Sequence, residues 1–67
     1  MVPRPGRRRL ALAAILADLE EIEQGARDAL RAARSAGMRS TAEILQAILL
    51  YAQLARMEAC REAGGCR

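Results

Sequence analysis

The side chains most able to do chemistry in this sequence are its two cysteines, Cys60 and Cys66. If one helix ran through both, their Cα atoms would lie ~9 Å apart, beyond the ~7 Å that a disulfide tolerates. Gly64-Gly65 should break that helix, so free thiols, a disulfide within or between chains, and a metal site shared by two chains all stay open. The sequence has no His, so a zinc site would need thiolates from two chains. We expect free thiols first, a disulfide second, and no metal.

Catalytic side chains are scarce. Without His, the chain lacks the usual base for proton transfer near neutral pH. Ser40 is expected to cap a helix, and Gly64-Gly65 precedes no helix that could bind a phosphate. The carboxylates are spaced as on solvated helix surfaces. The sequence therefore predicts a protein that is not an enzyme, with no catalytic residue and no cofactor.

Arginine supplies all eleven basic residues. Its guanidinium forms bidentate contacts with phosphates and carboxylates that Lys cannot form. Two groups are candidates for contacts with nucleic acid or an acidic partner: Arg7, Arg8 and Arg9 at the start, and Arg27, Arg31 and Arg34 on one helix stripe away from the apolar seam. The net charge of +3 is modest, however, and no aromatic is placed for base stacking. A solvated face, with acids before the arginines along a helix dipole, is the favoured interpretation.

Helices should position all of these side chains. The apolar half of the chain is mostly Ala, Leu and Ile, whereas Val2 and Thr41 are the only other β-branched residues. A length of 67 residues allows one domain, and so short a chain usually needs a covalent cross-link, a metal or a partner to be stable. We expect an all-α fold.

Stop and start signals between residues 37 and 43 predict a tight antiparallel αα-hairpin. Gly37 suits the left-handed position past a helix end, with Met38 folding back on Ala33. Ser40-Thr41-Ala42-Glu43 has the form of a capping box, with Ser40 as N-cap. The expected organisation is a flexible basic arm over 1–7, a helix over 8–36, a turn over 37–40, a helix over 41–63 and a tail over 64–67.

The apolar spacing indicates more apolar surface than a hairpin can cover. The first helix has one seam: Leu12, Ile15, Leu19, Ile22, Ala26, Ala29, Ala33 and Ala36. The second helix has two, about 200° apart: Leu45, Ile48, Ala52, Ala55 and Ala59, and then Ala47, Leu50, Leu54 and Met57. Because one neighbouring helix covers only one face, the second face should be an association site. Gly25 is a candidate bend or close-contact point in the first helix.

We expect this second face to bind a protein partner or a second copy, with a dimer favoured and a four-helix bundle as the product. The predicted contacts are Ala47, Leu50, Tyr51, Leu54 and Met57. Such a protein would act stoichiometrically, as an adaptor, inhibitor or co-chaperone. The alternative is a Rop-like dimeric bundle that binds RNA or DNA through the arginine stripe.

Residues 16–52, LADLEEIEQGARDALRAARSAGMRSTAEILQAILLYA, resemble in length and helix order two groups of small hairpin proteins. One comprises the co-chaperones of type III secretion needle subunits, and the other the phage-encoded inhibitors of bacterial enzymes and immune complexes. The resemblance implies a hairpin that packs against a partner. The polar "PEQYQ"-like start of the second helix in the co-chaperones is replaced here by STAEILQ.

The start of the chain has two interpretations. Its arginines followed by LALAAILA have the layout of a secretory signal peptide, with cleavage after Ala17. The apolar spacing nevertheless continues in register past Asp18, which favours a helix of the mature protein. No apolar run reaches the ~20 residues that span a bilayer. We expect a cytoplasmic protein of bacterial or phage origin, with secretion as the alternative.

Overall fold

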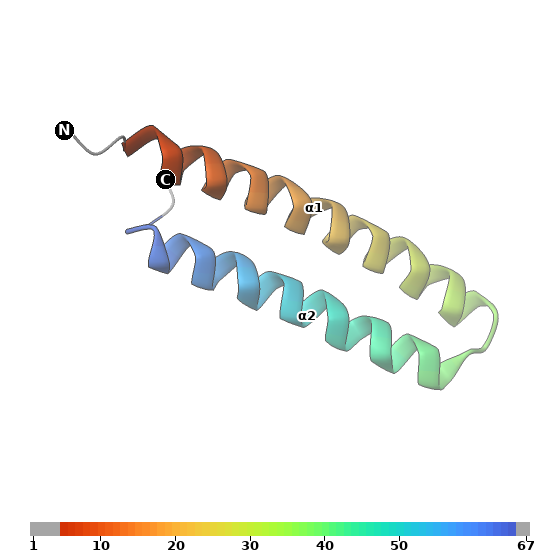
Figure 1. Ribbon diagram of the computed structural model, residues 1–67. Coiled ribbons are helices and arrows are strands. Elements are labelled where there is room, and N and C mark those ends of the chain that lie inside the picture. The colour runs from red at the N-terminus through yellow and green to blue at the C-terminus, as the bar shows by residue number, and fades with distance from the viewer. Residues whose placement is uncertain (1–4, 66–67) are drawn as a thin grey trace.

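The described part of the chain is an antiparallel hairpin of two helices (Figure 1). The computed structural model describes residues 5–65, with side chains from Arg9 onward. Helix α1 is Pro5–Ser35 and helix α2 is Arg39–Glu62. No strand occurs within residues 5–65. The all-α class and the hairpin are confirmed.

Helix α1 begins earlier than the sequence predicted. Pro5 is its first residue, where a proline loses no helical hydrogen bond and its fixed φ suits the first turn. The backbone of Arg7 is therefore helical, so the expected flexible arm over 1–7 is wrong for residues 5–7. Residues 1–4 lie outside the described part.

Glycine ends both helices by the same hydrogen-bond pattern. Gly37 has φ 72°, the N–H of Met38 donates to the carbonyl of Ala33 (2.8 Å), and the N–H of Gly37 donates to that of Arg34 (3.1 Å). This is a Schellman motif, and it confirms the predicted left-handed Gly37. At the end of α2, Gly64 has φ 93°. The N–H of Gly65 donates to the carbonyl of Cys60 (2.6 Å), and the N–H of Gly64 donates to that of Arg61 (3.1 Å).

The predicted capping box is wrong. The N-cap of α2 is Met38, which makes no side-chain capping bond, and Ser40 lies inside the first turn. The N–H of Ala42 already donates to the carbonyl of Met38 (2.9 Å). Because the Gly37 turn is so short, the helical ladder starts at Met38 and leaves no non-helical position for Ser40.

The packing seam is rotated from the predicted one. In α1 the buried or partly buried residues are Leu12, Leu16, Leu19, Glu23, Ala26, Leu30 and Ala33. In α2 the corresponding seam is Ala42, Leu45, Leu49, Ala52, Arg56 and Ala59. Ile15, Ile22 and Ile48, which were predicted to lie in the seams, are exposed. The rotation buries Leu30 in place of Ala29, but it also brings Glu23 into the seam in place of Ile22.

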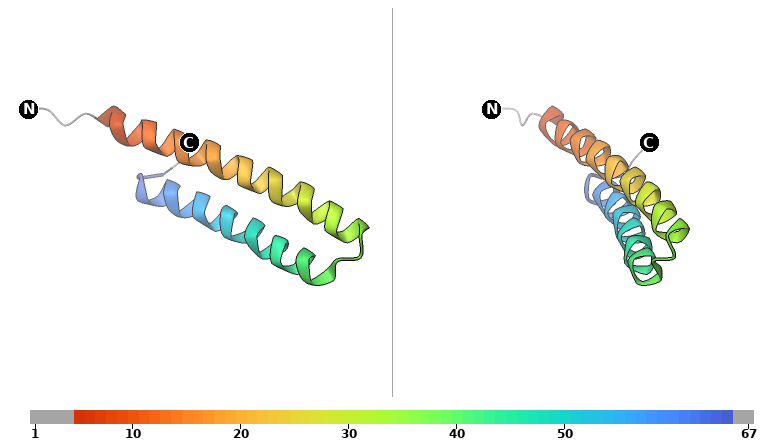
Figure 2. Two further views of the ribbon diagram at one scale, coloured as in Figure 1. Left: turned by 45° about the vertical axis from the view of Figure 1, so that its right-hand side comes forward. Right: turned by 90° about the vertical axis from the view of Figure 1, so that its right-hand side faces the viewer.

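The core is small and the molecule is elongated. Leu30, Ala33 and Ala42 form a buried cluster near the turn, with Leu45 packed against it. Both views in Figure 2 show a single layer of two helices, and the extents are 58 × 17 × 15 Å. The chain exposes 5674 Å², about 1,500 Å² more than a compact monomer of 7.3 kDa. The hairpin by itself therefore buries less surface than a typical small domain.

Candidate interaction surfaces

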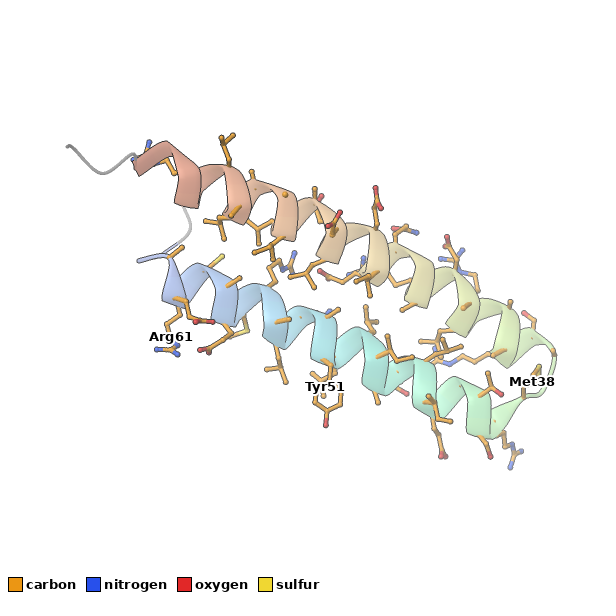
Figure 3. The ribbon with its side chains drawn as sticks, in the orientation of Figure 1. Met38, Tyr51 and Arg61 are labelled. Carbon is orange, nitrogen blue, oxygen red and sulfur yellow. The ribbon has the colours of Figure 1, made fainter. Side chains whose placement is uncertain are left out.

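The first candidate surface is the outer face of α2, which we define as Ala47, Leu50, Tyr51, Leu54 and Met57. All five predicted contact residues are exposed. Tyr51 is 70% exposed and Met57 67% exposed, and Tyr51 points away from α1 (Figure 3). The structure therefore brings the five residues onto one uncovered side of the helix.

Two shallow hollows lie on this side of α2. One, of about 410 Å³, is lined by Glu43, Gln46, Ala47, Leu49, Leu50 and Gln53. The other, of about 620 Å³, is lined by Tyr51, Leu54, Ala55, Met57, Glu58 and Arg61. In both, polar side chains border an apolar centre, which is the arrangement of a protein–protein interface.

An ion pair holds one rim of the second hollow. Nε of Arg61 donates to Oε2 of Glu58 (3.1 Å), and its Nη2 donates to Oε1 of the same carboxylate. This hydrogen bonding to Glu58 raises the pKa of Arg61 above its usual value; desolvation opposes the shift, and the nearby charge of Glu62 adds to it. An exposed pair adds little to stability. Its effect here is to orient the guanidinium beside the apolar centre of the hollow.

Glu23 is the site residue that sequence reasoning misplaced. The carboxylates were expected on solvated helix surfaces, but Glu23 is only 2% exposed. Its Oε1 lies 3.6 Å from Nη2 of Arg27 and 3.5 Å from Nη2 of Arg56, while Oε2 has no hydrogen-bond partner among the described residues. The spacing of the residues could have predicted this burial. Glu23 is a charged residue at a position in the apolar spacing of α1, and Arg56 is one at a position in that of α2.

These charges border a third hollow, on the flank of the hairpin that carries Glu20 and Arg27. It has a volume of about 520 Å³ and is lined by Ala17, Glu20, Glu21, Glu23, Gln24, Arg27 and Arg56. Carboxylates and guanidiniums are mixed in it, so it presents no field of one sign. With three carboxylates and two guanidiniums in the lining, its charges largely offset one another.

The arginine stripe is partly engaged within the hairpin. Arg27 contacts Glu23 and therefore borders the seam, although it was predicted to lie away from it. Nη1 of Arg31 lies 3.8 Å from Oδ1 of Asp28. Arg34 and Arg9 are exposed, whereas the side chains of Arg7 and Arg8 lie outside the described part. Nucleic-acid or acidic-partner binding by these residues stays a prediction.

The cysteines are placed only in part. Cys60 is partly buried and disulfide-bonded, so the preferred free thiol is not its state in the structure. Cys66, its predicted partner, lies outside the described residues. Among the residues that the structure describes, no group of three or more His, Cys, Asp or Glu gathers as metal ligands do.

Within residues 5–65, neither helix combines the length and the hydropathy needed to cross a bilayer. No protein-family model, no curated protein and no solved structure matches the chain.

Proposed function

We propose that this chain is a small non-catalytic protein–protein interaction module that binds a partner through the outer face of α2. The observation that carries the proposal is the exposure of Leu50, Tyr51 and Met57, of which Tyr51 points away from α1 (Figure 3). Contiguous apolar stripes on small monomers mark association sites. Positions 47, 50, 54 and 57 also have the spacing with which a helix anchors in an apolar groove.

The side chains of this face suit a binding site. Tyr51 offers a rigid ring with a polar tip, and tyrosine is enriched among residues that dominate binding energy. Met57 is flexible and fills irregular gaps. The module acts stoichiometrically, as an adaptor, inhibitor or co-chaperone, because its effect is to cover a surface of its partner. The expected cytoplasmic location and bacterial or phage origin belong to the same proposal.

Site-specific photo-crosslinking in the source cell tests this function. A photoreactive residue is placed at Leu54, on the outer face of α2, and in a matched control at Glu21, which is exposed on α1. We expect a discrete adduct with another protein from position 54 only. Adding Leu50→Asp should remove that adduct while circular dichroism shows that helicity is kept.

Two results would contradict the proposal. One is the same adducts from both positions, which indicates random collision. The other is an adduct at position 54 that survives Leu50→Asp, because a contact that tolerates a carboxylate in its centre does not bury this face.

A further inference from the structure

A second uncovered apolar surface lies on one flank of the hairpin. Ile15 and Ile22 come three residues after the seam residues Leu12 and Leu19, so they lie on one side of the α1 seam. Ile48 has the same relation to Leu45 in α2. Because the helices are antiparallel, equivalent flanking positions of both fall on the same side of the hairpin. The residues of this isoleucine flank are Ile15, Ile22, Gly25, Ala29, Ala32, Ile44, Ile48, Tyr51 and Ala55, so Tyr51 lies where the flank borders the outer face of α2.

We propose that the isoleucine flank binds a second copy of the chain, so that two hairpins pack into a four-helix bundle. The exposed area supports a copy as the occupant. Each chain exposes about 1,500 Å² more than a compact monomer of its mass, and a stable interface takes about 800 Å² from each partner. Pairing through this flank covers Tyr51, which lies on the same stripe of α2 as Ile44. It leaves Leu54 and Met57 of each copy uncovered, so these two residues stay available to the partner of the proposed function.

The flank is complementary to itself in shape when the two turns point in opposite directions. On α1 the large Ile15 and Ile22 lie toward the open end, and the small Ala29 and Ala32 lie toward the turn. A two-fold axis across the helices places α1 over α1 of the copy in the reverse direction. The isoleucines of one copy then pack on the alanines of the other, as knobs on small residues.

Charge selects the same orientation. The carboxylates on this flank are Asp18, Glu58 and Glu62, all toward the open end, and Glu58 is paired with Arg61. From Arg9 onward, no position of the flank is basic. Two copies with their turns together would gather both sets of carboxylates at one end, where like charges repel. With the turns at opposite ends, each set lies over the carboxylate-free turn end of the other copy.

Gly25 is the independent observation. It lies on the flank inside α1, ten residues before the helix ends at Ser35, where glycine weakens a helix. Nothing in the hairpin requires it, since a Cβ added there would meet no atom within 4 Å. A two-fold axis that passes beside Gly25 brings the two α1 backbones closest at this residue. The single hairpin is not stabilised by a glycine at this position. In a pair of hairpins, the absence of a side chain lets the two α1 backbones approach each other closely.

The test is the solution mass of the full, oxidised chain by light scattering over a range of concentrations. The native chain should have twice the 7.3 kDa of one copy. Gly25→Leu should raise the Kd of the dimer by on the order of a hundredfold while helicity is kept or increased. The control is Gln24→Leu, which places a leucine one residue away on the opposite flank, and it should leave the dimer intact.

A monomeric native chain overturns the proposal, and so does a dimer that tolerates Gly25→Leu. Equal loss with Gly25→Leu and Gln24→Leu also overturns it, because the two flanks would then not differ. The adduct at position 54 should persist in the Gly25→Leu monomer. Its loss would count against the partner-binding proposal and leave the result on the dimer unchanged.

Discussion

Beside the turn, α1 and α2 meet through Leu30, Ala33 and Ala42, whereas halfway along they meet through Glu23 and Arg56. The first contact is apolar and close, as small residues allow. The second places a carboxylate in the seam with one oxygen unpaired among the described residues. The free energy lost by removing a charge from water exceeds the free energy gained from a loose ion pair. The hairpin should therefore be most stable at the turn and fray from its open end.

Removing apolar volume at the turn should have the largest effect. Leu30→Ala should lower the free energy of unfolding by about 2–5 kcal/mol, because it opens a cavity in the only cluster of buried apolar residues found in the described part. Thermal unfolding followed by circular dichroism measures this loss. Leu10→Ala deletes the same atoms from a side chain that is 74% exposed, and it should cost less than about 0.5 kcal/mol. Equal losses would show that the turn end is not the stronger region.

At the ion pair in the middle of the seam, a single substitution should lower the free energy of unfolding, whereas a double substitution should not. Arg56→Leu should cost about 1–2 kcal/mol, less than a fully buried pair, because Arg56 is 43% exposed and Arg27 still faces Glu23. Glu23→Leu combined with Arg56→Leu should be neutral or stabilising, since it replaces charge by apolar packing. A double-mutant cycle on the unfolding free energies measures both. A double variant less stable than Arg56→Leu would mean that the ion pair holds the two helices together.

The turn itself offers a smaller change. Gly37→Ala should cost about 1 kcal/mol, because Gly37 has φ 72° and an alanine there is strained. Gly37→Asn should cost less, since asparagine tolerates the left-handed region better. Chemical denaturation of the two variants in parallel checks the order. If alanine were the better tolerated, the Schellman geometry would not limit the stability of this end.

The smallest effect on stability is expected at the arginine stripe. Arg31→Gln together with Arg34→Gln should change the unfolding free energy by less than about 0.5 kcal/mol, because the Arg31–Asp28 pair is exposed. Adding Arg27→Gln gives the variant that tests the Rop-like alternative by retention on immobilised RNA and DNA. Strong retention of the native chain that this triple variant loses would support that alternative over a purely protein-binding role.

The features that depend on local sequence were predictable. Glycine at position 37 and the continuous apolar spacing were enough for two helices and a tight turn between them. The rotation of the seam was not, because Leu12, Leu19, Ala26 and Ala33 belong to two alternative seams that differ by one residue at every other position. Which seam is buried depends on the opposing helix. The burial of Glu23 was not predicted for that reason. Ser40 was predicted to be the N-cap of the second helix, but the turn is shorter than expected and the helix begins before Ser40.

The short connection through Gly37 also has a kinetic consequence. The residues of the apolar cluster are close in sequence, so a single chain closes its hairpin through local contacts and should fold within microseconds to milliseconds. Encounter with a second chain or a partner is slower and depends on concentration. If the chain pairs as proposed above, each newly made chain first spends a period as a folded but unpaired hairpin. The length of that period, in which proteases and competing partners have access to it, is set by how many copies the cell makes.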